Sequence, residues 1–177
     1  KKARPMVKVC DWSPAPRTAF RASALVTESS GRFLNDRSHT SLKAAALGRI
    51  GGHDEALALY RQLLDARPEE PKLWMSYGHI LKTVGEQAGS IEAYRRALKI
   101  QPTLGEVWWS LANLKTIRFD DDDVAAMETA LNAPRLGKED RFHLHFALGK
   151  ALEDRDEVQG SFGHYAEGNR LRRAMLD

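Results

Sequence analysis

The sequence predicts an all-α protein built from repeated pairs of helices. Three pairs of bulky or rigid residues are each 34 positions apart: Tyr60 and Tyr94, Pro68 and Pro102, Trp74 and Trp108. A fixed period of this length is typical of architectures in which one helical unit stacks on the next. No segment shows the strict alternation of apolar and polar residues that marks a half-buried strand. The chain of 177 residues has room for about four such units.

Residues 1–36 do not follow this period. Residues 1–50 carry ten Lys or Arg and three Asp or Glu, a net charge of +7, whereas residues 51–177 carry seventeen and twenty-one, a net charge of −4. Prolines favour an extended start, and residues 18–29 have the apolar spacing of a helix that packs on the first unit. The chain begins without Met and without the apolar core of a signal peptide, so we expect a piece of a longer protein.

The most regular unit is residues 71–104. It contains aromatic, small and helix-ending residues at set positions: Trp74, Tyr77-Gly78, Leu81, Ser90, Tyr94, Ala97 and Pro102. Small residues let two helices approach closely, and a proline ends the second helix because it cannot continue it. These residues resemble the tetratricopeptide repeat, a helix–turn–helix of 34 residues. The resemblance implies a right-handed α-α superhelix, or solenoid.

The other units match this repeat less completely. Residues 37–70 match it in their second helix, through Ala56, Tyr60 and Pro68. Residues 105–138 match it in their first helix and diverge in their second. Residues 142–175 match it through Gly149, Ser161, Tyr165 and Gly168. We therefore expect four repeats with these boundaries, in which Tyr60, Trp74, Tyr94, Trp108 and Tyr165 are core residues.

The last two units also resemble the repeat region of bacterial tetratricopeptide-containing sulfotransferases. The resemblance rests on residues 108–116, Arg118-Phe119, 146–154, 164–169 and Arg172-Arg173. It implies that a larger parent enzyme uses 3′-phosphoadenosine 5′-phosphosulfate in a downstream domain. Gly137-Lys138 and Gly149-Lys150 lack the strand and glycine spacing of a phosphate loop. We therefore predict that this chain has no catalytic residues and binds no cofactor.

The tetratricopeptide resemblance also implies a concave binding groove lined by the first helix of each repeat. Its positions are Lys72, Met75, His79 and Lys82, then Glu106, Trp109, Asn113 and Thr116, then His143, Phe146, Lys150 and Glu153. From these we select a predicted peptide-binding groove of Lys72, Met75, His79, Lys82, Trp109, Asn113 and Lys150. Aromatic anchors among polar groups suit peptide binding, lysines suit an acidic peptide, and Asn113 suits peptide backbone. Alternatively, Trp109 and Phe146 are covered by the fourth repeat, by residues 1–36 or by a downstream domain.

Other residues invite chemical interpretations that their spacing does not favour. His143 and His145 are two positions apart, about 200° around a helix, so they cannot bind one metal ion together; we expect one to face the groove and the other to pack between helices. Asp120 to Asp123 lack the ligand pattern of a calcium loop and suit a helix N-terminus. Cys10 is the single cysteine, which excludes an internal disulfide and a multi-thiolate zinc site. We predict no metal site.

The predicted function is a scaffold that binds a protein or peptide and positions its own downstream catalytic domain. The basic residues are scattered, so we expect no nucleic-acid partner. No apolar run of about 18 residues predicts a membrane span, and we expect a cytoplasmic protein. Two alternatives stay open: an acceptor-selecting region of an O-linked N-acetylglucosamine-type glycosyltransferase, and a structural module for self-association. The sequence leaves the ligand and the oligomeric state undetermined.

Overall fold

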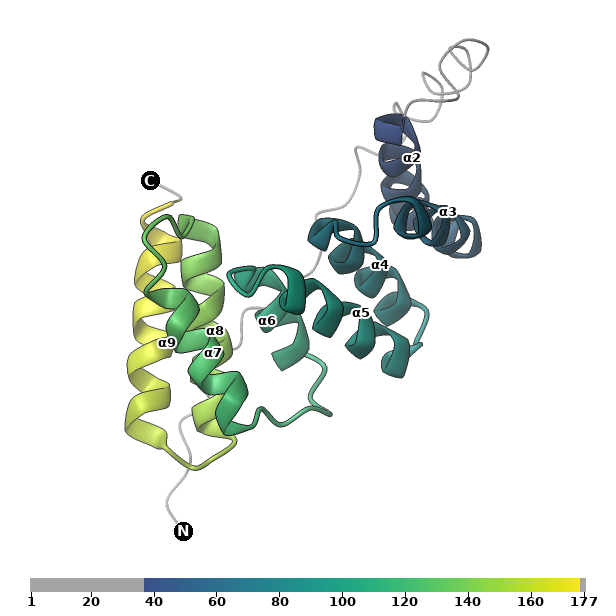
Figure 1. The fold of residues 1–177 in the computed structure, drawn as a ribbon. Helices are drawn as coiled ribbons and strands as arrows, with labels where there is room; N and C mark the ends of the chain where they lie inside the picture. The colour runs from purple at the N-terminus through teal and green to yellow at the C-terminus, as the bar shows by residue number, and fades with distance from the viewer. Residues whose placement is uncertain (1–36, 176–177) are drawn as a thin grey trace. The chain divides into compact units, whose positions relative to one another are not determined.

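The computed structural model describes residues 37–175, and its regular secondary structure there is entirely helical. The helices are α2 (Arg37–Ile50), α3 (His53–Ala66), α4 (Pro71–Thr83), α5 (Gln87–Ile100), α6 (Gly105–Ala112), α7 (Asp121–Leu131), α8 (Lys138–Glu153) and α9 (Val158–Arg173) (Figure 1). The all-α prediction is confirmed for this part of the chain. The helix predicted within residues 18–29 lies outside the described residues.

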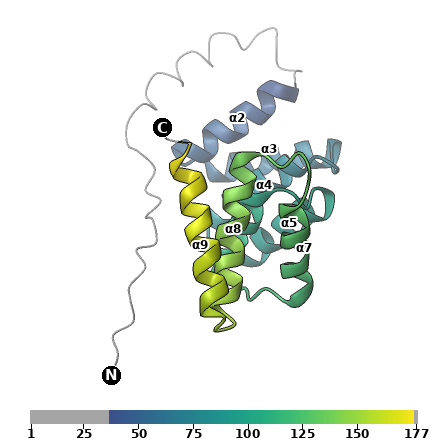
Figure 2. The same cartoon turned by 90° about the vertical axis from the view of Figure 1, so that its left-hand side faces the viewer.

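Consecutive helices form three antiparallel hairpins: α2 with α3, α4 with α5, and α8 with α9. Figures 1 and 2 both show α8 and α9 side by side along their length. The tight turns after α2 and α4 contain Gly51 and Gly85, whose φ angles are 93° and 86°. Glycine adopts this left-handed conformation without the steric cost that a side chain would add. The glycines therefore set where each first helix ends.

The third pair, α6 and α7, departs from this hairpin pattern. Helix α6 has only eight residues, and residues 113–120 separate it from α7. Both helices pack mainly on α8. Salt bridges from Arg95 of α5 to Asp123 and from Arg155 to Asp121 hold the start of α7. The neighbouring units thus fix α7 where the local repeat pattern is weak.

Three groups of buried apolar residues form the core. The largest runs from α5 to α8 and includes Leu98, Val107, Leu111, Met127, Leu144 and Leu148. The second joins α2, α3 and α4, and the third joins α3, α4 and α5. Trp74 packs against all three groups, so this one side chain joins the core of the first hairpin to that of the later helices.

The aromatic residues predicted to be core differ in their exposure. Tyr60, Tyr94 and Trp108 are at most 3% exposed, as predicted. Trp74 and Tyr165 are only half-buried because their polar atoms reach groups near the surface. The Trp74 indole donates a hydrogen bond to the Pro68 carbonyl at 2.7 Å, and the Tyr165 hydroxyl donates to Glu153 at 2.9 Å.

Small residues on the first helices receive aromatic rings from the second helices. A Cβ atom added at Gly78 would lie 2.7 Å from the Tyr94 ring, and one at Gly149 would lie 2.9 Å from the Tyr165 ring. The predicted close approach of paired helices is therefore present in both hairpins. None of the helices in residues 37–175 combines the length and apolarity needed to cross a bilayer.

Candidate functional site

The seven predicted groove residues belong to three neighbouring first helices. We call the surface formed by α4, α6 and α8 the first-helix surface. Helix α6 lies between the α4–α5 hairpin and α8 (Figure 1). It packs directly on α8, and its Ser110 Oγ lies 3.2 Å from His79 Nε2 of α4. Together these helices carry Lys72, Met75, His79, Lys82, Trp109, Asn113 and Lys150.

His79 is the most desolvated titratable residue of the predicted groove. Burial, assisted by the positive charge of Lys82, lowers its pKa from 6.5 to about 4. Its ring lies edge-on to Tyr94, with 5.5 Å between the ring centroids. His79 is therefore neutral at pH 7 and serves as a hydrogen-bonding group rather than a cation.

A buried polar cluster lies beneath His79, and sequence reasoning missed it. Ser90 and Tyr94 are fully buried, and Ser110 is 9% exposed. The Tyr94 and Ser90 hydroxyls are buried without a hydrogen bond within residues 37–175, and burial raises the pKa of Tyr94 well above its usual range. The spacing of Ser90 and Tyr94 on α5 carried a packing signal, but nothing in the sequence placed Ser110 of α6 beside them.

The three predicted lysines differ in their partners. Lys150 is half-buried and forms a salt bridge with Asp154 one turn later. Lys72 and Lys82 are exposed, and no carboxylate in residues 37–175 forms an ion pair with either. Partial burial lowers the pKa of Lys82. Lys82 is thus an exposed cation without an ion-pair partner among the described residues.

Carboxylates also gather on this surface, at the N-terminal ends of α6 and α8. Burial raises the pKa of Glu106, and the negative charges of Asp140 and Glu139 add to that effect. Burial also raises the pKa of Asp140, although Asp140 accepts a 2.9 Å hydrogen bond from the Gly105 N–H and is attracted by Lys72. The surface is therefore acidic near the start of α6 and basic near the end of α4, where Lys82 lies.

The two aromatic residues at predicted groove positions, Trp109 and Phe146, differ in how far they are exposed. Trp109 is half-buried, and its ring centroid lies 5.4 Å from that of Phe146. Phe146 is only 8% exposed, so for this ring the alternative of coverage by the fourth repeat holds. The Phe146 ring packs against Gly168 of α9, so the fourth unit covers this ring with its own second helix.

The two remaining residues of the predicted groove are Met75 and Asn113. Met75 is half-buried against the largest core group. Asn113 is also half-buried and directly follows α6 as its C-cap, where its backbone N–H donates to the Trp109 carbonyl at 3.0 Å. Asn113 therefore lies one helical turn after Trp109, at the end of α6.

The two histidines of α8 point to different neighbours, as expected from their spacing. His143 lies against Phe142, with 4.1 Å between ring centroids, and burial lowers its pKa to about 4. His145 faces α9, where its Nδ1 lies 3.1 Å from Nδ1 of His164. Among residues 37–175, no group of three or more His, Cys, Asp or Glu side chains is arranged to hold a metal ion.

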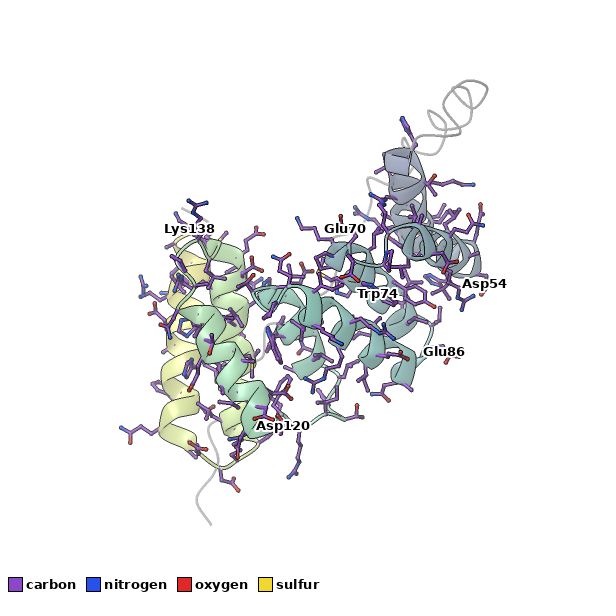
Figure 3. All side chains as sticks on the ribbon, viewed as in Figure 1. Asp54, Glu70, Trp74, Glu86, Asp120 and Lys138 are labelled. Carbon is purple, nitrogen blue, oxygen red and sulfur yellow. The ribbon has the colours of Figure 1, made fainter. Side chains whose placement is uncertain are left out.

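The acidic run at residues 120–123 begins α7. Asp120 lies at the N-terminal end of α7 (Figure 3), and its carboxylate accepts a 2.8 Å hydrogen bond from the Asp123 N–H. The predicted helix cap is confirmed. Asp123 has a second role that the sequence did not indicate, because its carboxylate is buried against the Arg95 guanidinium.

A separate pocket of about 290 Å³ lies between α3, α4 and α5. Trp74, Tyr77 and Leu81 line it together with the charged residues Arg61, Asp65 and Glu92. No residue of the predicted groove lines this pocket, so it is distinct from the first-helix surface.

The stacked helix pairs define a helical-repeat protein of the solenoid class. Comparison with known proteins specifies the repeat: residues 71–104 match the family model of the tetratricopeptide repeat. The fold is that of tetratricopeptide-repeat solenoids.

The two relatives align with much of this chain, but the aligned part is a small share of each relative's own length. Protein FlbA of Caulobacter vibrioides is 29% identical over 113 residues, which are 62% of this chain and 18% of FlbA. An uncharacterized protein of Aquifex aeolicus is 25% identical over 117 residues, which are 66% of this chain and 15% of that protein. The chain thus spans less than a fifth of either relative.

Solved structures share the fold at low sequence identity. BtubC from P. vanneervenii superposes with a TM-score of 0.63 at 18% identity, covering 89% of this chain and 74% of BtubC. A crystal structure of MamA gives a TM-score of 0.59 at 12% identity, covering 88% of both chains. MamA from Desulfovibrio magneticus RS-1 gives a TM-score of 0.56 at 16% identity, covering 85% of this chain and 84% of that one.

Proposed function

We propose that the first-helix surface binds an acidic segment of a partner protein and that this chain is a non-catalytic interaction scaffold. Tetratricopeptide repeats generally mediate protein–protein interactions, which supports this class of function. The expected ligand is an extended peptide that carries a carboxylate and a large apolar side chain.

The observation that carries the proposal is the environment of Lys82. Its side chain is exposed, it lacks an ion-pair partner within residues 37–175, and the adjacent His79 is neutral. A lysine without an ion-pair partner can form a charge-assisted hydrogen bond with a carboxylate of the ligand. A ligand carboxylate would supply the missing counter-ion.

Trp109 and Asn113 provide the other two contacts in the proposed complex. The half-buried Trp109 ring suits an apolar side chain of the ligand, and aromatic residues of this kind carry much of the energy of protein interfaces. The Asn113 amide has a donor and an acceptor, which matches the two polar groups of a peptide bond. The carboxylates at the start of α6 would repel an acidic ligand there and so favour one orientation.

The proposal is tested with peptides selected from a random library by the purified protein. The tightest peptide is then titrated against Lys82→Ala, Trp109→Ala and Asn113→Ala by fluorescence anisotropy. We expect each change to weaken binding about tenfold, which corresponds to about 1.4 kcal/mol. Lys99→Ala is the matched control, because Lys99 is an exposed lysine on the second helix α5. Equal affinity of all variants, with circular dichroism unchanged, would contradict the assignment.

We further propose that the chain is the repeat region of a larger sulfotransferase. The support is the resemblance of residues 108–116, 146–154 and 164–169 to such repeat regions. In that protein the repeats would select the acceptor, and a separate domain would hold 3′-phosphoadenosine 5′-phosphosulfate. The coding sequence that follows residue 177 tests this directly: a strand–loop–helix with a phosphate-binding loop would support it. A parent gene without one would leave the interaction scaffold as the whole function.

A further inference from the structure

Two histidines face each other across the last hairpin. His145 lies on α8 and His164 on α9, and their Nδ1 atoms are 3.1 Å apart. The ring centroids are 5.2 Å apart, and the ring planes are inclined by 40°. Both side chains are half-buried, so solvent reaches one side of the pair. Figures 1 and 2 show that the two helices run side by side, which holds the rings at this separation.

The distance between the two nitrogens suits a shared metal ion as well as a shared proton. Zinc–imidazole bonds are roughly 2.0–2.1 Å long, so two nitrogen ligands at a tetrahedral angle are about 3.3 Å apart. The observed 3.1 Å is close to this value, so the helices need not move apart. To bind one ion, the two Nδ1 lone pairs must converge on one point, which requires the rings to turn about their Cβ–Cγ bonds.

The charges around the pair are balanced. Glu167 of α9 and Glu128 of α7 act electrostatically on His145 and His164 respectively. The cations near His145 are Arg141 and Arg170. Glu167 is held by Arg170 through hydrogen bonds of 2.7 and 2.6 Å, whereas the exposed Glu128 forms no side-chain hydrogen bond or ion pair within residues 37–175. Glu128 is thus available to attract a cation to His164.

Metal binding through Nδ1 requires both imidazoles to be neutral. Burial lowers the pKa of His145, and the neighbouring His164 lowers it further. Burial also lowers the pKa of His164, against a smaller opposing effect of Glu128. In a complex that uses both Nδ1 atoms, each neutral ring would carry its proton on Nε2.

We propose that His145 and His164 bind one divalent transition-metal ion of the Zn²⁺ type through their Nδ1 atoms, with water in the remaining positions. Imidazole nitrogen suits Zn²⁺, Ni²⁺ and Cu²⁺, whereas Mg²⁺ and Ca²⁺ require oxygen ligands. The ion would join α8 to α9 and so fasten the last hairpin. This inference is independent of the peptide-binding proposal, because the histidine pair lies between α8 and α9 and contributes none of the predicted groove residues.

The test is titration of the whole chain with Zn²⁺ at pH 7.5 by isothermal calorimetry, and with Mg²⁺ as the metal control. We expect one Zn²⁺ per chain and no heat from Mg²⁺. Histidine side-chain ¹⁵N spectra should show Zn²⁺-dependent shifts at Nδ1 of two residues. His145→Ala and His164→Ala should each weaken Zn²⁺ binding at least tenfold, and His143→Ala is the matched control from the same helix.

Thermal unfolding gives a second readout. Zn²⁺ in excess should raise the midpoint of the wild-type protein and of His143→Ala, and it should not raise that of His145→Ala or His164→Ala. The spectra of the wild-type protein decide the question even if a variant fails to fold. Absence of Zn²⁺ binding by the wild-type protein, or binding equal in all variants, would overturn the proposal.

Discussion

Replacing Gly105 with alanine should destabilise the protein, although alanine favours an isolated helix. Gly105 is the first residue of α6 and is buried against the start of α8. A Cβ atom at this position would lie 2.1 Å from the backbone oxygen of Asp140. Ordinary contact distances begin near 3.4 Å, so the two helices would have to separate by roughly 1 Å. A flexible side chain could move away, but a helix backbone cannot.

The size of the effect follows from two opposing contributions. Overpacking a well-filled site costs about 1–3 kcal/mol, and the upper end applies because the obstacle is backbone. Alanine recovers up to about 1 kcal/mol of helix propensity relative to glycine. Separation of α6 from α8 would also stretch the 2.9 Å hydrogen bond from the Gly105 N–H to Asp140. We expect the free energy of unfolding to fall by about 2 kcal/mol.

Gly163→Ala is the matched control. Gly163 lies in the middle of α9, it is exposed, and no atom lies within 4 Å of a Cβ built there. Alanine should stabilise the protein at this position by about 0.5–1 kcal/mol. Urea denaturation followed by circular dichroism measures both variants against the wild type. Equal midpoints for the two variants would refute the inference that the approach of α6 to α8 requires glycine.

Two further predictions concern charged groups. The free energy of unfolding should decrease as the pH falls from about 6.5 to about 4, because the unfolded chain protonates His79 before the folded protein does. His79 alone accounts for about 3 kcal/mol of this loss, so urea titrations at several pH values should show a flatter profile for His79→Phe. Asp123→Ala should cost about 2 kcal/mol, because it leaves Arg95 without its buried partner. This cost is below the 3–5 kcal/mol that breaking a fully buried ion pair causes, because the Arg95 side chain is 39% exposed. The control in the same assay is Asp122→Ala, which replaces an exposed carboxylate and should be nearly neutral.

Much of the helical framework could be predicted from local patterns. The 34-residue period identified the paired helices, and the glycines at 51–52 and 85 marked turns where the structure has them. The Asp120 cap was also predictable, because a helix N-terminus needs acceptors for its free N–H groups. The exposure of Phe146 was not predictable from its position in the repeat, because α9 and not α8 determines whether that ring meets solvent.

The first-helix surface also combines features that the sequence predicts with features that only the structure shows. Its residues on α4, α6 and α8 were selected from the period alone, and their assignment to ligand binding stays a prediction. The repeat positions include Ser90 and Tyr94 of α5, but they do not specify the contact of His79 with Ser110 of α6 or the burial that removes the charge of His79. The pairing of His145 with His164 likewise required the distance between α8 and α9.

The sequence by itself determined that this protein is a stack of helix pairs, because period, turns and caps are properties of short segments. Only the tertiary structure decided which groups on those helices are desolvated, paired or within reach of one another. Burial and electrostatic effects depend on the atoms of neighbouring helices, and these lie 19 to 36 positions away in the contacts of His145, Arg95 and Arg155.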